Sequence, residues 1–243
     1  RGADRKGDSV AHPFPMRYLS LYCDPMRLLS ITLVLASLSL TACGGKTIAF
    51  SECQKAVERW SADSNARATE PEQDACKAAA EAGSVDAMLT LGTELMKGTH
   101  MTKDEAQGFA LFLNAANRGS VNGAYNVALS YARGQGVTAS NESALQWFMN
   151  AARKGDSGAA LALGIMYLNG EGTPKDAMRA YAWFDAAVRG GYADAREYRD
   201  QLASSFSADD KKKAEEAAAQ LQSALASEND SASQPNETNS PLL

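Results

Sequence analysis

The sequence predicts an all-α fold, an α/α-hairpin solenoid of repeats that ends in a helical C-terminal cap. Three observations support this prediction. Alanine is abundant, β-branched residues are few, and proline is nearly absent between residues 72 and 233, a composition that favours helices. Apolar residues recur at helical spacing in paired runs, as expected of hairpins that need neighbours to bury their apolar faces. Glycine recurs every 36 residues, at Gly83, Gly119, Gly155 and Gly191.

Each unit carries signals for the end of its first helix and the start of its second. Asp104 and Asp176 stand where a second helix starts and can accept hydrogen bonds from its free N–H groups, and Ser140 takes this place in the middle unit. Trp147 and Trp183 lie in the second helices and are expected to fill the space between hairpins. Glycine ends the first helix in each unit, where it can adopt the left-handed capping conformation, at Gly98, Gly134 and Gly170. We place the repeats at about residues 83–118, 119–154 and 155–190.

The repeated pattern resembles the Sel1-like repeat family, whose α/α hairpins are related to tetratricopeptide repeats. It reads roughly A-x-x-x-L-G-x-x-Y-x-x-G-x-G-V-x-x-D-x-x-x-A-x-x-W-F-x-x-A-A-x-x-G and covers residues 83–191. The first unit departs from the pattern at His100 and Met101, and Leu111 replaces tryptophan there. The resemblance implies a scaffold that serves in protein complexes.

Residues 26–42 have the pattern of a lipoprotein signal peptide. Arg27 is followed by an apolar run from Leu28 to Leu40, which is shorter than the roughly 20 residues that a membrane-spanning helix needs. The letters "LTAC" that end at Cys43 resemble a bacterial lipobox, which implies that the Cys43 thiol is lipidated and that the protein carries acyl chains such as palmitate. The alternative is an ordinary signal peptide or a buried core helix that ends in a cysteine.

The residue that follows the lipobox cysteine bears on the choice of membrane. In lipoproteins of Gram-negative bacteria an aspartate at this position retains the protein in the inner membrane, whereas this chain has Gly44. By that resemblance we expect an outer-membrane lipoprotein that faces the periplasm. Residues 1–25 precede this complete signal, and we interpret them as a mis-called upstream extension, with Met26 favoured over Met16 as the start.

The rest of the chain divides into three parts by composition. Residues 43–70 are expected to form a tether or N-terminal segment. Residues 71–226 are expected to form the solenoid, in which capping helices follow the three repeats. Residues 227–243 ("SENDSASQPNETNSPLL") are polar and poor in apolar side chains, which predicts a disordered tail.

Two cysteines, Cys53 and Cys76, follow the lipobox. In an oxidising periplasm two thiols in one small domain are expected to pair. Such a disulfide would stabilise the fold by roughly 3 kcal/mol in the chain-entropy model and would tie the N-terminal segment to the first repeat helix. Two buried thiols or a metal site are the alternatives, but two sulfurs without a nearby histidine make a poor metal site.

The residues give no pattern of a catalytic or cofactor-binding site. After the signal peptide, His100 is the one histidine, and it lies in an interhelix loop where we expect a solvated turn residue. The chain has 24 Lys+Arg against 29 Asp+Glu, a net charge of −5, and lacks the basic stripe that nucleic-acid binding requires. We therefore expect a protein that is not an enzyme, with no cofactor, metal, nucleic acid or small-molecule substrate.

A stripe along the first helices is the candidate partner-binding surface. Positions 7, 11 and 14 residues after each recurring glycine fall on one helix face and vary while the packing positions recur. Tyr125 adjoins the stripe and is the expected anchor, because aromatic residues dominate interface hot spots. An ordinary solvated helix face is the alternative. The candidates are Thr90, Glu94, Lys97, Tyr125, Asn126, Ser130, Arg133, Ala162, Met166 and Asn169.

These observations lead to the hypothesis of a membrane-anchored periplasmic scaffold or adaptor that binds a protein partner through its repeat surface. The family resemblance leaves two alternatives open. One is an immunity protein that neutralises a secreted antibacterial effector such as a phospholipase. The other is an activator of a cell-wall enzyme.

Overall fold

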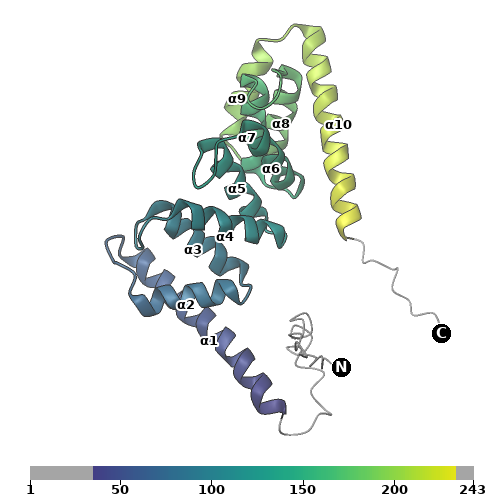
Figure 1. The fold of residues 1–243 in the computed structure, drawn as a ribbon. Coiled ribbons are helices and arrows are strands. Elements are labelled where there is room, and N and C mark those ends of the chain that lie inside the picture. Colours follow the sequence, from purple (N-terminus) through teal and green to yellow (C-terminus); the bar gives the residue numbers. More distant parts are fainter. Residues whose placement is uncertain (1–34, 234–243) are drawn as a thin grey trace, which may run out of the picture. The chain divides into compact units, whose positions relative to one another are not determined.

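The computed structural model describes residues 35–233, with side chains from residue 48 to residue 228. This part of the chain contains ten α-helices and no β-strand (Figure 1). The chain divides into two compact units, Arg1–Ile48 and Ala49–Leu243. The helices are α1 (Leu35–Ala62), α2 (Glu70–Glu81), α3 (Val85–Lys97), α4 (Glu105–Asn117), α5 (Val121–Arg133), α6 (Asn141–Arg153), α7 (Ser157–Asn169), α8 (Ala177–Arg189), α9 (Ala195–Ser204) and α10 (Ala208–Ser233).

Two expectations for the N-terminus fall partly or wholly outside this range. Residues 1–25 lie outside the described residues, as do residues 26–34 of the predicted signal peptide. Residues 35–42 of that peptide, and Cys43, belong to α1. Within the described part of the chain, no helix is both long and apolar enough to cross a membrane.

Three hairpins of equal length form the repeats: α3/α4, α5/α6 and α7/α8, in which every helix has 13 residues. The first helix of each hairpin ends at a glycine with positive φ, as predicted: Gly98, Gly134 and Gly170. The second helix follows a residue whose side chain accepts a hydrogen bond from the backbone N–H three residues later: Asp104, Ser140 and Asp176. The predicted all-α solenoid of α/α hairpins is confirmed.

Glycine inside the first helix allows the two helices of a hairpin to approach closely. A Cβ atom built on Gly92 would lie 2.7 Å from Cε1 of Phe112 in α4. A Cβ atom on Gly164 would overlap the Phe184 ring of α8 in the same way. Glycine within a helix costs about 1 kcal/mol of stability, so this close packing is the reason that both hairpins carry it.

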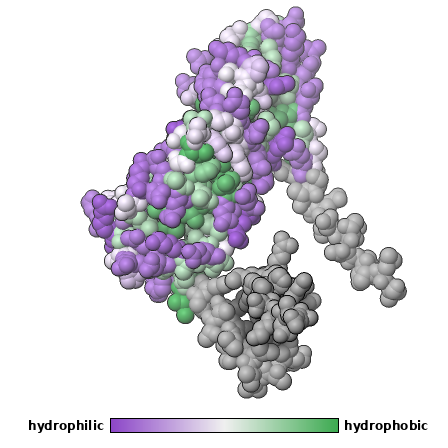
Figure 2. All heavy atoms as spheres, in the orientation of Figure 1, coloured by the Kyte–Doolittle hydropathy of each residue, from purple (hydrophilic) through white to green (hydrophobic). Residues whose placement is uncertain are grey.

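Two hydrophobic clusters form the core. The N-terminal cluster joins buried residues of α1, α2 and α3 with Met101 and with Ala115 of α4, and the C-terminal cluster joins buried residues from α4 to α9. Phe184 and Leu163 of the C-terminal cluster are fully buried. Trp183 is buried and Trp147 packs partly buried against the same cluster, so both tryptophans lie in the core as expected. In the view of Figure 2, hydrophilic residues dominate the visible surface of the described chain, with hydrophobic residues grouped between them.

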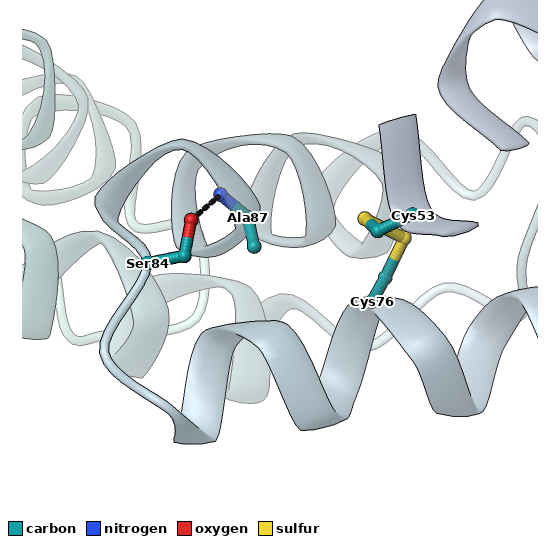
Figure 3. Close-up of a disulfide and its surroundings, with 4 residues drawn as sticks. All are labelled: Cys53, Cys76, Ser84 and Ala87. Atoms are coloured by element: carbon teal, nitrogen blue, oxygen red, sulfur yellow. Dashed lines mark hydrogen bonds between the residues drawn. A yellow bond between two sulfur atoms is a disulfide. The ribbon is translucent and has the colours of Figure 1, made fainter. Parts of the chain in front are cut away.

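The end of α1 belongs to the core and is bound to it by a disulfide. Cys53 of α1 and Cys76 of α2 form the predicted bridge, and both are buried (Figure 3). Ala56 and Trp60 of α1 are buried as well. Residues 43–70 were expected to be a tether or N-terminal segment. The structure differs from a tether here, because the disulfide and the Trp60 ring give α1 buried contacts that a flexible linker lacks.

The chain leaves the last hairpin through α9 and returns along the second helices as α10. α10 lies beside α8 and also contacts α6 (Figure 1). Its Ala214 and Ala218 are buried, and Leu221 and Leu225 pack against the C-terminal cluster. This long helix therefore covers the C-terminal cluster, as the predicted capping helices should.

The helix α10 also extends into the segment that was predicted to be disordered. It continues to Ser233, whereas disorder was expected from residue 227. An ion pair of 3.6 Å joins Glu228 of α10 to Arg153 of α6, so this end of α10 has a contact that composition alone does not indicate. Residues 234–243 of the predicted tail lie outside the described residues.

Candidate partner-binding groove

The first helices of the first two repeats line an open groove with a volume of about 360 Å³. Its two walls are formed by α3 and α5. On each helix the lining residues lie one turn apart, and residues three or four apart share a helix face. Four of the predicted partner-binding residues line it: Thr90, Glu94, Tyr125 and Asn126. The other lining residues are Leu89, Thr93 and Asn122. The structure thus gathers part of the predicted stripe into one concave site.

Three of these residues were missed by the sequence analysis. Leu89 and Thr93 lie one residue before Thr90 and Glu94, and Asn122 lies one turn before Asn126. The stripe was defined by fixed offsets of 7, 11 and 14 residues, and a groove between two helices also exposes the flanking positions. The i, i+4 spacing of Asn122 and Asn126 was the available signal.

Tyr125 is the aromatic residue of the groove. It is half-buried, and its ring meets Phe148 of α6 edge-on, with the ring centroids 5.6 Å apart. Burial raises the pKa of the Tyr125 phenol above its usual value, and the nearby Asp156 and Tyr192 act in the same direction. The phenol is therefore neutral at physiological pH, and its hydroxyl can both donate and accept a hydrogen bond.

Glu94 is the charged residue among those that line the groove. Its side chain is 14% exposed, and Oε2 lies 2.6 Å from Nδ1 of His100. In the described part of the chain, Oε1 of Glu94 has no hydrogen-bond or ion-pair partner. The carboxylate is thus held by one oxygen while the other can accept a further hydrogen bond.

His100 is buried, which corrects the expectation of a solvated turn residue. Only 8% of its surface is exposed, and its ring stacks on Trp60 with the centroids 5.7 Å apart. Its carbonyl oxygen accepts a 2.8 Å hydrogen bond from the backbone N–H of Ala68. The residue is buried because α1 and the segment after it fold over the loop that carries it. Its Nε2 has no partner in the described part of the chain.

Two of the predicted partner-binding residues lie in the interior and are corrected by the structure. Ser130 is 2% exposed, and its hydroxyl donates a hydrogen bond to the carbonyl of Asn126. Met166 is 4% exposed and belongs to the C-terminal cluster. Both occupy the position that Glu94 holds in α3, but in α5 and α7 a small or apolar side chain there packs inward.

Three of the remaining candidates lie on the surface at the C-terminal ends of first helices, and Ala162 lies in the middle of α7. Lys97 ends α3, Arg133 ends α5 and Asn169 ends α7, and all three are exposed. Asn169 donates a hydrogen bond to Glu171. Ala162 is half-buried. None of the four lines the groove between α3 and α5, so their role in partner binding stays a prediction.

Among the described residues, no group of three or more His, Cys, Asp or Glu side chains is arranged to hold a metal ion. The Glu94–His100 pair has no third such side chain beside it in this part of the chain. The chemistry available in the groove is therefore hydrogen bonding, charge pairing and apolar contact.

Comparison with known proteins supports the repeat assignment. The Sel1 repeat model matches residues 85–120, 121–156 and 157–192, each two residues later than the boundaries drawn from the sequence. No curated protein matches the chain. Sel1 repeats generally bind protein partners, and the fold they form is typically a non-enzymatic scaffold.

Two solved structures of Sel1-type proteins resemble the chain. One is c5321, described as a protective antigen present in uropathogenic Escherichia coli strains and displaying an SLR fold: 25% identity, TM-score 0.59, 72% of this chain and 38% of that chain covered. The other is a Sel1 repeat protein from Oxalobacter formigenes: 25% identity, TM-score 0.51, 61% of each chain covered. This chain thus spans less than two thirds of either relative. The three hairpins α3/α4, α5/α6 and α7/α8 match the Sel1 repeat model, and they form a solenoid of α/α hairpins.

Proposed function

We propose that the chain is a scaffold that binds an extended segment of a partner protein in the groove between α3 and α5. The observation that carries this proposal is the gathering of amide, hydroxyl and aromatic side chains in one open concave site. These residues differ between the repeats, whereas the glycines and aromatic residues that pack the hairpins recur. Groove residues that differ between repeats, on hairpins whose packing residues recur, are suited to the recognition of one particular partner.

The groove offers the groups that peptide recognition uses. The side-chain amides of Asn122 and Asn126 can each donate to a backbone carbonyl and accept from a backbone N–H. Tyr125 supplies a rigid aromatic surface, and such residues often contribute most of the binding energy of an interface. The volume of about 360 Å³ lies at the small end of ligand pockets, which run from about 300 to 1,000 Å³, and so suits a single side chain with its flanking backbone.

We further propose that the scaffold works at the periplasmic face of the outer membrane, anchored by lipid on Cys43. The lipobox pattern supports this placement, and the Cys53–Cys76 disulfide suits an oxidising compartment. The alternatives of an immunity protein and of a cell-wall enzyme activator differ from this proposal in the identity of the partner. No contact in the groove favours either of them.

A large cationic side chain introduced on the groove wall tests whether partners bind there. Asn126→Arg should abolish capture of partner proteins from an envelope extract by the immobilised full chain. Asn117→Arg is the matched control, because Asn117 is an exposed asparagine of α4 outside the groove. Proteins that are captured equally by both variants and by the unaltered chain would show that the groove is not the binding site.

Lipidation is tested by metabolic labelling with radioactive palmitate in a bacterial host. Cys43→Ala should abolish incorporation of label. The double variant Cys53→Ala/Cys76→Ala should be labelled normally, because these two sulfurs are bonded to one another. Continued labelling of Cys43→Ala would refute the proposed anchor.

A further inference from the structure

The charge of Glu94 sets this groove apart from an ordinary polar surface. Of the seven described side chains that line the groove, Glu94 alone carries a carboxylate. No ion pair joins it to Lys97, the cation one turn further along α3, in the described part of the chain. The groove therefore presents one anionic oxygen among uncharged amide, hydroxyl and apolar groups.

The carboxylate is held in place before any partner arrives. Its Oε2 is hydrogen-bonded to His100, whose ring stacks on Trp60 and whose backbone carbonyl accepts a hydrogen bond from Ala68. With its side chain 14% exposed, Glu94 has also lost most of its contact with water. A group already desolvated and oriented loses less on binding, so it binds a complementary group more tightly than a mobile surface carboxylate.

Comparison of the repeats shows that hairpin packing does not require this charge. The positions equivalent to Glu94, 36 and 72 residues later, hold Ser130 and Met166. Both are buried in hairpins of the same length as the first. Since a hydroxyl or a thioether serves the fold at this position, the carboxylate of the first repeat needs a different explanation.

We propose that the groove accepts a lysine or arginine side chain of the partner segment, with Glu94 as its counter-ion. This inference rests on the proposed function and specifies the partner's chemistry. A partner that covers the groove removes the remaining water from Glu94, which is costly unless a donor or a cation replaces that water. An acidic or purely apolar side chain would leave the carboxylate uncompensated, and a basic one satisfies the free Oε1.

The neighbouring residues suit the rest of a basic side chain. The methylene stem of lysine or arginine can pack on Leu89 and the Tyr125 ring, because long basic side chains bury their stems while the head remains polar. Asn122 and Asn126 then reach the backbone of the same segment. The net charge of −5 favours the approach of a basic partner from a distance.

Selection from a phage-displayed library of random peptides tests the inference directly. The immobilised bait is the full chain in detergent, in the unaltered form and as Glu94→Gln, which keeps the size of the side chain and an oxygen for His100. We expect the unaltered chain to enrich peptides with lysine or arginine at a fixed position. Replacing that lysine by norleucine in the synthetic peptide should weaken binding about tenfold or more.

A double-mutant cycle then identifies the contact. If the basic residue meets Glu94, the norleucine peptide should bind Glu94→Gln at least as tightly as the unaltered chain, since it offers no cation to offset the desolvated carboxylate. Thermal unfolding monitored by circular dichroism checks that Glu94→Gln folds. Thr90→Arg, which keeps the Glu94–His100 pair but places a cation on the groove wall, should weaken the same peptides independently.

The outcomes separate this inference from the function on which it rests. Enriched peptides without a conserved basic residue, or with equal affinity for Glu94→Gln, would overturn the basic anchor. If those peptides still lose binding to Asn126→Arg, the groove stands as the binding site and only its counter-ion is refuted. If no enriched peptide responds to Asn126→Arg, both the groove and the basic anchor are refuted.

Discussion

The two ends of this solenoid are held by different kinds of contact. At the N-terminal end, α1 is joined to the repeats by the Cys53–Cys76 disulfide, the His100–Trp60 stack and the Arg59–Glu72 ion pair. At the C-terminal end, α9 and α10 cover the last hairpin through apolar and aromatic contacts and through the Arg199–Asp185 ion pair. A repeat array must close both its ends, and here a disulfide contributes to one closure while the other consists of noncovalent contacts.

This difference assigns different roles to the two ends. The C-terminal end lies on the second helices, away from the residues that line the groove. The N-terminal end holds His100, which positions Glu94 in the groove. Damage at the N-terminal end should therefore alter partner binding as well as stability, whereas damage at the C-terminal end should act mainly through stability.

The largest effect is expected from the apolar end. Phe184→Ala removes a fully buried ring that packs on Gly164 and stacks on Tyr198, so it should lower the free energy of unfolding by about 3–5 kcal/mol. Urea denaturation followed by circular dichroism measures the loss. Leu168→Ala is the control, because Leu168 is exposed and its truncation should change stability little. A loss below about 1 kcal/mol for Phe184→Ala would contradict the described core.

The disulfide comes next. Cys53→Ala/Cys76→Ala should lower stability by roughly 3 kcal/mol, and the loss should be confined to the N-terminal end. Hydrogen exchange should accelerate at the end of α1 and in α2 while α7 and α8 remain protected, because repeat proteins open in local units. Equal acceleration in α7 and α8 would show that the two ends form one cooperative unit, which the comparison denies.

Much of this fold follows from local signals. The positions of Gly98, Gly134 and Gly170 mark helix ends that the structure confirms, because a left-handed cap is a property of a few neighbouring residues. The burial of His100 could not be predicted in this way. It depends on Trp60, 40 residues earlier in the sequence, and on the packing of α1 against the first repeat.

The groove was predictable in part, because some of its residues follow a local spacing pattern. Helical spacing identified Thr90, Glu94 and Asn126, because they share one face of their own helix. It also selected Ser130 and Met166, which the structure buries. The sequence of one helix cannot show which part of that face the neighbouring hairpins cover.

A smaller effect is expected at the link between the N-terminal end and the groove. His100→Ala removes the stack on Trp60 and leaves Glu94 without its described partner, so it should lower stability by about 1–3 kcal/mol. Binding of groove-dependent peptides should weaken as well, since Glu94 is no longer positioned. Phe206→Ala at the C-terminal end, beside Tyr181, should lower stability without a matching change in affinity, as measured by fluorescence anisotropy.

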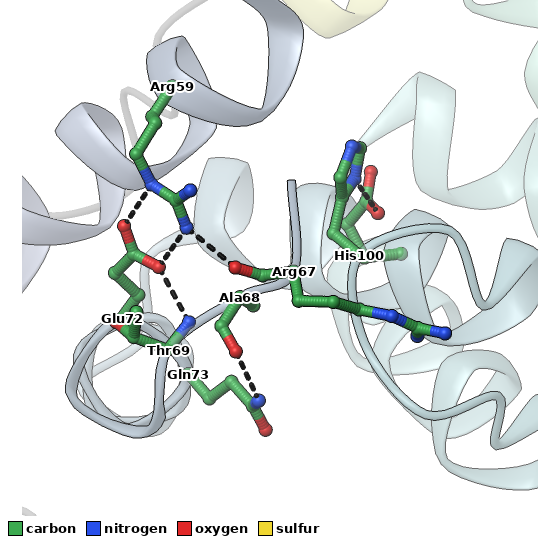
Figure 4. A network of polar contacts seen from close by, with 8 residues as sticks. Arg59, Arg67, Ala68, Thr69, Glu72, Gln73 and His100 are labelled. Carbon is green, nitrogen blue, oxygen red and sulfur yellow. Dashed lines mark hydrogen bonds and ion pairs between the residues drawn. The ribbon is translucent and has the colours of Figure 1, made fainter. Parts of the chain in front are cut away.

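The smallest effect concerns the exposed ion pair of the N-terminal end. The Arg59 guanidinium donates to both oxygens of Glu72, at 2.6 and 2.5 Å, and the backbone N–H of Thr69 donates to Oε2 at 2.7 Å (Figure 4). These contacts, the Arg59 hydrogen bond first, lower the pKa of Glu72 from 4.5 to about 2. Because the folded chain holds the charged form more strongly than the unfolded chain, this contribution to stability is complete above about pH 4.5 and disappears as the pH falls through about 2.

Glu72→Gln removes that contribution and so tests its sign. The variant should be slightly less stable than the unaltered chain at neutral pH, and the difference should vanish toward pH 2, as measured by urea denaturation across the acid range. Added salt at neutral pH should narrow the difference, because Arg59 is partly exposed and its charge is screened. Glu216→Gln, an exposed residue of α10, should not share this pH dependence. A difference that grew in acid would mean that Glu72 is stabilised in its protonated form, and the N-terminal closure would then not depend on its charge.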